Sequence, residues 1–328
     1  MRLCSSFPFR LIAGIAAGTL AVLPLTAAAQ TFPTRTVRII VPFPAGGTAD
    51  VMPRVVADWL SRKWGQPVVI ENKTGAAGNI GAEAAFKADP DGYTLLSAPP
   101  PPLVINQNLY PNLPFDPTRF VPISVMGIVP NALLVNPKKM TATTVAELIA
   151  YAKQHPGKIT DATQGNGTTS HLTAELFQMM AGVKFTHVPY RGSAPAQQGL
   201  LAGDVDIMFD NLGVSLGLVK SGQLKLMAVG TEQRISALPD VPTIAETLPG
   251  FASSTWFAVV APPKTPAAIV DRISADIAAA VRDPAVRKRL ADLSAEPVGN
   301  TPAEAAAFMR AEVERWNKVI KAANVKLQ

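Results

Sequence analysis

The chain has 328 residues, of which 48% are hydrophobic and 16% are charged, and its formal net charge is +6. Its one cysteine, Cys4, excludes an internal disulfide framework and a cysteine-rich metal site. Basic residues form no long run and do not alternate with aromatic residues, so the composition argues against nucleic acid as a partner and suits a small anionic ligand. After residue 30, no apolar stretch is long enough to cross a membrane.

The N-terminal segment has the pattern of a secretory signal. Arg2 and Arg10 precede an apolar run over residues 11–25, and an Ala-Ala-Ala cleavage pattern follows. The alternative is a membrane anchor, but the run is shorter than the roughly 20 residues that a span requires. The sequence therefore predicts that residues 1–29 are a signal peptide and that the mature chain begins at Gln30 in the periplasm.

The first part of the mature chain alternates between strand-like and helix-like segments. The predicted strands cover residues 37–42, 68–71 and 93–97, and the predicted helices cover residues 49–64 and 80–88. This alternation is typical of a parallel sheet covered by helices.

From about residue 122 the pattern changes to two extended runs with no helix between them, and then the alternation resumes. The further predicted helices cover residues 145–155, 170–181, 194–202 and 215–220, and the further strands cover 159–163, 185–189, 206–209 and 224–229. Another extended run covers residues 255–262, and the remainder is mostly helical, including 269–282 and 302–323.

Two α/β units joined by two extended segments predict two lobes with a ligand between them, at the carboxyl ends of both sheets. We expect residues 30–128 and 256–328 to form the first lobe, and residues 129–255 to form the second.

The first predicted strand runs through Pro-Phe-Pro-Ala-Gly-Gly into a helix. The segment lacks Gly-Lys-Ser/Thr and G-x-G-x-x-G, so it is not a nucleotide-binding loop of either kind. Gly46 and Gly47 let the backbone approach a ligand closely, and Thr48 is placed to cap the helix. Free amides and the helix dipole there favour a carboxylate or a phosphate. For Asp50, complementing the dipole is favoured over contacting the ligand.

A second glycine-rich turn, residues 165–170, lies between a strand and a helix in the other lobe. Two helix starts that face one cleft can hold a carboxylate without any arginine. A third glycine loop, residues 74–79, either lines the same cleft or allows close packing. Residues 99–102 are four prolines, which predict an extended, helix-free loop with few backbone donors.

Two patterns argue against a metal site and against a hydrolase active site. His155, His171 and His187 are 16 residues apart each time and have no neighbour at metal-ligand spacing, so the sequence predicts no metal site. His171 is interpreted as a helix-start residue, and the other two as surface or helix-end residues. Residues 213–217 match G-x-S-x-G, but no histidine follows Ser215, as a hydrolase of that fold would need.

Five stretches carry a resemblance to a known family: VRIIVPFPAGGTAD, QPVVIENKTGAAGNIGAEAAFKADPDGYTLL, DATQGNGTTSHLTAELF, HVPYRGSAPAQQGLLAGDVDIMFDN and LPDVPTIAET. Together they resemble the solute-binding receptors of the tripartite tricarboxylate transporter family, also called Bug receptors. The resemblance covers essentially the whole mature chain. One departure is the stretch SAPPPPLVIN after the third strand, where many relatives are more polar, so ligand choice does not transfer from them.

The resemblance implies a Venus-flytrap fold of the periplasmic-binding-protein type: α/β, type II-like, with two crossover segments. It also implies a monomer without enzymatic activity or cofactor, which binds a carboxylate through backbone amides, hydroxyls and waters and passes it to a two-subunit membrane permease. A periplasmic ligand sensor for a signalling system stays an alternative, and a secreted α/β hydrolase is a weaker one.

The predicted ligand-binding residues fall in four places: the two opposing loops, the end of the third strand, and the end of the strand over residues 206–209, ahead of Asn211. They are Phe43, Ala45, Gly46, Gly47, Asp50, Ala98, Pro99, Gly165, Asn166, Thr168, Thr169, His171 and Asp210. The proline-rich wall favours an aromatic carboxylate or a plain dicarboxylate over citrate or an amino acid.

Overall fold

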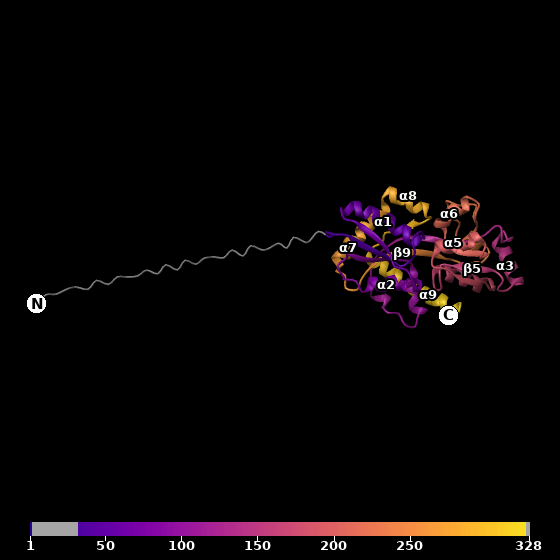
Figure 1. Cartoon of the computed structure of the whole chain (residues 1–328), viewed down its shortest axis with the longest axis horizontal. Helices are drawn as coiled ribbons and strands as arrows, with labels where there is room; N and C mark the ends of the chain where they lie inside the picture. Colours follow the sequence, from indigo (N-terminus) through magenta and orange to yellow (C-terminus); the bar gives the residue numbers. More distant parts are fainter. Residues whose placement is uncertain (2–31, 326–328) are drawn as a thin grey trace. The chain divides into compact units, whose positions relative to one another are not determined.

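The computed structural model describes Met1 and residues 32–325 (Figure 1). The predicted signal peptide, residues 1–29, lies outside the described residues apart from Met1. Among the helices of the described part, none is both long and apolar enough to cross a membrane.

The first lobe is built on a parallel sheet. Its strands β1 (Val37–Val41), β2 (Val68–Asn72) and β3 (Thr94–Ala98) run parallel, and helices α1 (Thr48–Trp64) and α2 (Asn79–Phe86) connect them. Strand β9 (Ser254–Ala261) joins β3 antiparallel. These elements confirm the strand and helix predictions for this region to within a few residues.

Strand β4 (Val121–Val135) links the two lobes. The sequence predicted two extended runs here, but they form one strand of 15 residues. Its first part pairs antiparallel with β9, up to Pro130 opposite Ser254, and its last part pairs with β7 (Ile207–Asn211), from Asn131 onward. The register of its pairing with β9 shifts between Pro122 and Ser124 and again between Val125 and Gly127, but the strand continues through both shifts.

The second lobe repeats the strand–helix alternation. Its central strand is β5 (Thr160–Thr163), which pairs in parallel with β6 (Thr186–Pro189) on one side and with β7 on the other. Strand β8 (Lys225–Val229) pairs antiparallel with β4. The helices are α3 (Val145–Gln154), α4 (Thr169–Ala181), α5 (Ser193–Ala202) and α6 (Leu212–Lys220).

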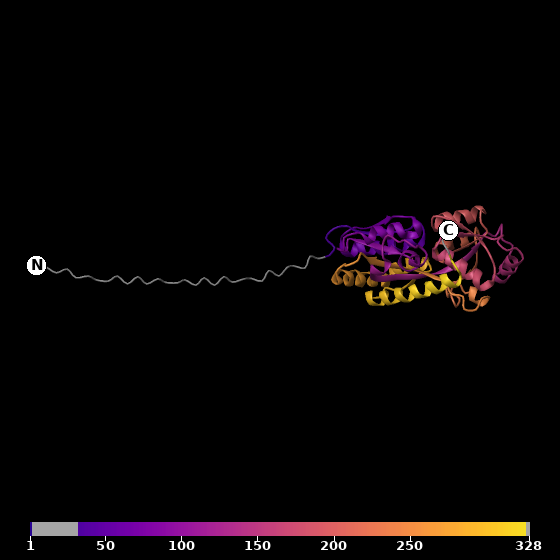
Figure 2. The same cartoon turned by 90° about the horizontal axis from the view of Figure 1, so that it is seen from below.

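The C-terminal segment returns to the first lobe. It contains α7 (Ala267–Arg282), α8 (Pro284–Asp292), β10 (Glu296–Pro297) and α9 (Pro302–Ala322). In Figure 2 the yellow α9 and the orange α7 lie beside the indigo N-terminal elements, and the magenta and pink middle segments form the other lobe. Buried Glu312 of α9 accepts hydrogen bonds from the indoles of Trp256 and Trp316, at 2.8 and 3.0 Å. This ties α9 to β9.

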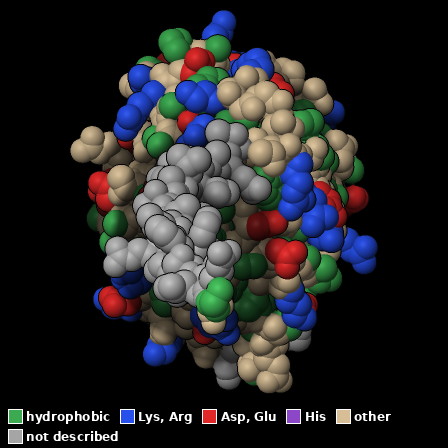
Figure 3. Space-filling view, turned by 90° about the vertical axis from the view of Figure 1, so that its left-hand side faces the viewer, with side chains coloured by type: hydrophobic (Ala, Val, Ile, Leu, Met, Phe, Trp, Pro, Cys, Tyr) green, Lys and Arg blue, Asp and Glu red, His purple; other side chains and the backbone are tan. Residues whose placement is uncertain are grey.

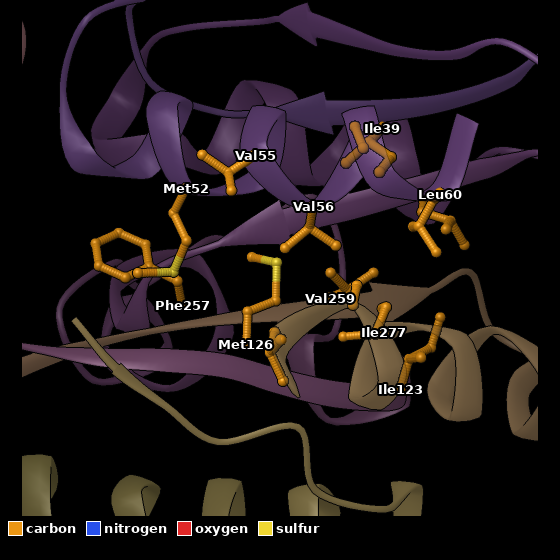
Figure 4. Packing of buried hydrophobic residues seen from close by; sticks show 14 of the residues in the cluster. Ile39, Met52, Val55, Val56, Leu60, Ile123, Met126, Phe257, Val259 and Ile277 are labelled. Atoms are coloured by element: carbon orange, nitrogen blue, oxygen red, sulfur yellow. The ribbon is translucent and has the colours of Figure 1, made fainter. Parts of the chain in front are cut away.

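A buried apolar cluster fixes α1 on the first-lobe sheet (Figure 4). Met52, Val56 and Leu60 recur at helical spacing and all lie on the covered face of α1. They meet Ile39, Ile123, Met126, Phe257, Val259 and Ile277 from β1, β4, β9 and α7. Because this cluster holds the helix rigidly, the glycine turn that begins α1 is also held in place.

The prediction for the proline run is wrong. Residues 101–105 form a π-helical turn, and Pro100 already has right-handed helical torsions. A helix start tolerates proline because its first N–H groups have no intrahelical acceptor. The run therefore enters a helical turn directly after β3, and this turn offers few backbone donors.

Charged groups of both signs are interspersed on the face of the first lobe in Figure 3. Arg35 pairs with Asp91 at 2.8 Å, and Arg38 pairs with Glu71 at 3.2 Å. The face in Figure 3 is therefore mixed in charge and carries no stripe of one sign.

Candidate functional site

A small cavity lies between the two lobes. Its volume is about 20 Å³, enough for about one water molecule. The first lobe and strand β9 contribute Phe43, Pro44, Gly47, Thr48, Ala49, Pro99, Pro101, Thr255 and Phe257, and the second lobe contributes Gln164, Thr168, Thr169, Gly192, Ser193 and Asn211. We call this the inner cavity.

The two lobes touch beside it. A side-chain carbon on Gly47 would lie 3.5 Å from Cβ of Ser193, and one on Gly192 would lie 3.0 Å from Cδ of Pro44. Gly192 also has φ of +102°, which L side chains rarely adopt. Glycine at these positions therefore allows the close approach of the two loops.

Four of the described helices begin at the inner cavity: α1, α4, α5 and α6. The N-cap residues of α1, α5 and α6 are Gly47, Gly192 and Asn211, and none of them caps its helix with a side-chain hydrogen bond. The first amides of a helix have no intrahelical acceptor, and its dipole is positive at this end. The electrostatics of these helix starts therefore suit an anionic group.

One hydroxyl in the cavity has no partner. Thr48 is 1% exposed, and its Oγ1 makes no hydrogen bond. A buried hydroxyl left unpaired costs about 1–3 kcal/mol. The sequence assigned Thr48 a capping role, but the side chain does not cap α1. Its hydroxyl is instead available to a ligand in the cavity.

Thr169 supplies a second hydroxyl. Its Oγ1 lies 2.9 Å from Oγ1 of Thr255, and because the Thr255 proton goes to Oδ1 of Asn131, Thr169 donates to Thr255 and keeps a free lone pair on the cavity side. Its neighbour Thr168 is committed locally, because Thr168 Oγ1 donates to the carbonyl of Gly165 at 2.7 Å and accepts from the amide of His171 at 3.4 Å. Thr168 therefore shapes the loop.

Asp210 lies behind the cavity wall. Its carboxylate is fully buried and accepts hydrogen bonds from Ser193 and Gln197 at 2.7 Å, Gln164 at 2.6 Å and Ser215 at 3.2 Å. Burial raises its pKa above the usual range, although these donors counteract part of the effect. The carboxylate thus holds Ser193 and Gln164 where they line the cavity.

Asp50 has a similar role in the first lobe. Its two oxygens accept from the amide of Gly46 at 3.1 Å, from Arg54 at 2.9 Å and from Asn72 at 2.9 Å. Burial raises its pKa, but these hydrogen bonds and the Arg54 charge outweigh that effect and lower it overall. Asp50 therefore fixes the opening loop and does not line the cavity, although it was among the predicted ligand-binding residues.

A larger chamber adjoins the inner cavity and shares Phe43, Pro44, Gln164 and Gly192 with it. Its volume is about 370 Å³. One wall is the third glycine loop, where residues 75–78 all have positive φ. The other wall includes Tyr190 and Arg191 of the second lobe. We call this the outer chamber.

The predicted site residues are divided by the fold. Phe43, Gly47, Pro99, Thr168 and Thr169 line the inner cavity, and Gly165 lines the outer chamber. The remaining predicted residues line neither: Ala45 and Gly46 are exposed, Ala98 is buried in β3, Asp50 and Asp210 support the loops, and Asn166 and His171 face another hollow. The sequence interpretation placed Asn211 at the cleft and gave Thr48 a capping role, but it omitted Gln164, Gly192, Ser193 and Thr255, although Gly192 and Ser193 also begin a helix after a strand.

The fold brings two of the three histidines together, contrary to the sequence interpretation. Ligand atoms of His171, Glu175 and His187 lie within 4.8 Å of one another. His187 is held between Asp161, at 2.9 Å from Nδ1, and Glu175, at 2.8 Å from Nε2. Burial lowers its pKa, but the two carboxylates outweigh burial and raise it to about 9. His187 is therefore protonated at neutral pH.

His171 is poorly placed to bind a metal. Its Nδ1 accepts a hydrogen bond from the amide of Gly167 at 3.2 Å, so a neutral ring carries its proton on Nε2. That nitrogen is the one that faces Glu175, at 3.6 Å. The lone pair that a metal would need is therefore occupied, and the cluster is best described as an ion-pair network beside the glycine loop.

The G-x-S-x-G match is also structural. Ser215 lies inside α6, is fully buried and donates to Asp210 at 3.2 Å. The sequence predicted a short helix start here, and the observed helix confirms it.

Comparison with known proteins identifies the family. The family model described as "Tripartite tricarboxylate transporter family receptor" matches residues 52–325. The chain belongs to this family. The protein is thus a periplasmic solute-binding protein and not an enzyme, and the two-lobed α/β fold expected from the sequence is confirmed.

Relatives and solved structures agree with this assignment. Protein BugT of Bordetella pertussis is 39% identical over 303 residues, which cover 92% of this chain and 93% of BugT. The structure of R. palustris Rpa4515 with adipate is similar with a TM-score of 0.87 and 40% identity, covering 90% of this chain and 99% of that one. MatC from Rhodopseudomonas palustris, solved with bound malate, has a TM-score of 0.83 and 33% identity, covering 88% and 100%.

Proposed function

We propose that this receptor binds a carboxylate group of a small organic acid in the inner cavity and delivers the acid to a two-subunit membrane permease. The observation that carries the proposal is the convergence of four helix starts on a cavity with an unpartnered buried hydroxyl, that of Thr48. Amides and hydroxyls satisfy a carboxylate without a positively charged side chain.

The apolar part of the wall supports a plain acid body. Phe43, Pro99, Pro101 and Phe257 line the inner cavity and offer no side-chain donor. A ligand rich in hydroxyls or amines would leave polar groups unpaired against them, at about 1–3 kcal/mol each. The related structures contain adipate and malate. We therefore favour a plain dicarboxylate or an aromatic carboxylate over citrate or an amino acid.

Transport also requires export and opening. We propose that residues 1–29 are removed as a signal peptide and that the mature protein is a monomer. Residues 30–128 and 256–328 would move against residues 129–255, about the point where Val129 of β4 pairs with Thr255 of β9. The contacts between Gly47 and Ser193 and between Gly192 and Pro44 would then belong to the closed arrangement.

A thermal-shift screen of carboxylic acids on the mature chain tests the proposal. A ligand at about 100 times its Kd stabilises the native state by about 2.7 kcal/mol, which is readily measured. We expect stabilisation by straight-chain diacids or aromatic acids, confirmed by calorimetry. If no carboxylate among mono-, di- and tricarboxylic, aromatic and amino acids binds, the proposal is wrong.

A further inference from the structure

The outer chamber contains one positively charged side chain. Arg191 is the one charged residue among the described residues that line it, and none of these residues is acidic. Arg191 is exposed and makes no ion pair with any other described residue. Arg54, which follows the opening loop, differs in this respect, because it is paired with Asp50 at 2.8 Å. The guanidinium of Arg191 is therefore free to bind a group that enters the chamber.

The position of the chamber relates this arginine to the carboxylate site. Gly192, the residue after Arg191, lines both the chamber and the inner cavity, as do Phe43 and Gln164. The inner cavity, at about 20 Å³, has room for about one water-sized group such as a carboxylate oxygen, so the rest of a bound acid must extend into the chamber of about 370 Å³. A substituent at the far end of the acid would then lie on the side of Arg191.

We propose that Arg191 forms a second, distal anion subsite, which makes the receptor selective for acids with two carboxylates at opposite ends. This rests on the proposed function, because it assumes that the first carboxylate occupies the inner cavity. A guanidinium presents planar donors that match a carboxylate with two parallel hydrogen bonds. The opposite wall, the loop of residues 75–78, is backbone and small side chains, so it leaves room for a linear chain and contributes no competing charge.

The two subsites recognise different parts of the ligand. Helix starts and hydroxyls in the inner cavity bind any carboxylate, whereas Arg191 distinguishes a dicarboxylate from the monocarboxylate of equal length. An uncharged far end, such as a methyl group, gains nothing from Arg191. A positively charged far end, such as an ammonium group, is repelled by it, which disfavours amino acids that extend in this orientation.

A calorimetric comparison of matched acids tests the proposal. Diacids from malonate to suberate and terephthalate are each paired with the monoacid of the same length, including adipate with hexanoate and terephthalate with benzoate. The wild-type receptor is expected to bind the best diacid about tenfold or more tightly than its monoacid. In Arg191→Gln that ratio is expected to fall to within about twofold of one, through weaker binding of the diacid.

The matched control is Arg287→Gln. It makes the same charge change on an exposed residue of α8, which lines neither the inner cavity nor the outer chamber. It is expected to keep the wild-type ratio. If Arg191→Gln also keeps that ratio while diacids still bind, the distal subsite is wrong and the proposed function stands. If no acid of either series binds the wild-type receptor, carboxylate capture fails and the subsite fails with it.

Discussion

Thr255 donates a hydrogen bond through Oγ1 to Oδ1 of Asn131 at 2.9 Å, where β9 and β4 run side by side between the two lobes. Asn131 is fully satisfied: its amide nitrogen donates to Thr173 at 3.0 Å and Ser253 at 2.8 Å, and its oxygen also accepts from Asn211 at 3.0 Å. One buried side chain therefore joins both linking strands to α4 and to the start of α6. Such a network specifies one arrangement when every member is paired.

We predict that Asn131→Ala lowers the free energy of unfolding by about 3 kcal/mol, because it leaves several buried donors and acceptors without partners. Urea unfolding of the mature chain measures the change. Asn317→Ala is the matched control, since Asn317 makes one hydrogen bond, to Asn108 at 3.1 Å, at a partly exposed position. Equal losses in the two variants would contradict the importance assigned to the network.

The unpartnered hydroxyl of Thr48 predicts a separation of stability from binding. Thr48→Val removes a buried polar atom that has no hydrogen bond, so the melting temperature is expected to stay the same or rise. Ligand affinity is expected to fall by about tenfold to a hundredfold, because loss of a hydrogen bond to a charged group costs about 1.5–3 kcal/mol. Thermal melting without ligand and calorimetry with ligand measure the two effects.

Thr168→Val is the contrasting variant. Thr168 caps α4 and donates to Gly165, so its loss is expected to destabilise the protein by about 1 kcal/mol even without ligand. A marked drop in the stability of Thr48→Val would show that its hydroxyl has a structural role.

The elements of this fold follow closely from local sequence patterns, and the exceptions have identifiable causes. The turn from β1 through Gly47 into α1 is visible because glycine, a helix start and the apolar spacing of Met52, Val56 and Leu60 coincide. The continuity of β4 was missed, because strand bulges leave no clear sequence pattern. The proline run was predicted to be extended, but proline at a helix start loses no hydrogen bond.

The candidate site was predicted only in part, because local sequence patterns do not reveal which side chains face the cavity. Gly-rich helix starts indicated where an anion binds, but not that Asp210 would lie behind the wall or that Thr48 would lack a cap. His171 and His187 are distant in sequence, and they meet because α4 packs over the sheet that contains β6. Contacts of this kind depend on tertiary packing, which sequence spacing does not report.

Gly47 gives a prediction about closure. Its φ of −82° suits valine, but the added methyl groups would grow from a Cβ that is already 3.5 Å from Ser193. We expect Gly47→Val to fold normally and to bind ligand at least tenfold more weakly, because the lobes no longer close fully. Calorimetry and X-ray scattering with and without ligand measure both effects.

In Gly217→Val a comparable side chain meets nothing within 4 Å, so closure is expected to persist. Unchanged affinity in Gly47→Val would contradict this account.

The His187 network predicts that stability depends on pH. The folded pKa of His187 is raised from 6.5 to about 9, so its contribution is fully present below about pH 6.5 and is lost as the pH rises through about 9. Among the groups that face it, Glu175 has a lowered pKa, His171 has one lowered to about 4, and burial raises that of Asp161 to about 6. The pKa values of these three groups lie below 7, so above pH 7 His187 is the group of this network that changes its protonation state. We expect the free energy of unfolding to fall by about 2.5 kcal/mol more in the wild type than in His187→Gln between pH 7 and pH 10, as measured by urea unfolding. His155→Gln, at an exposed helix end, is expected to keep the wild-type pH profile. Parallel profiles for wild type and His187→Gln would show that the two carboxylates do not hold a proton on His187.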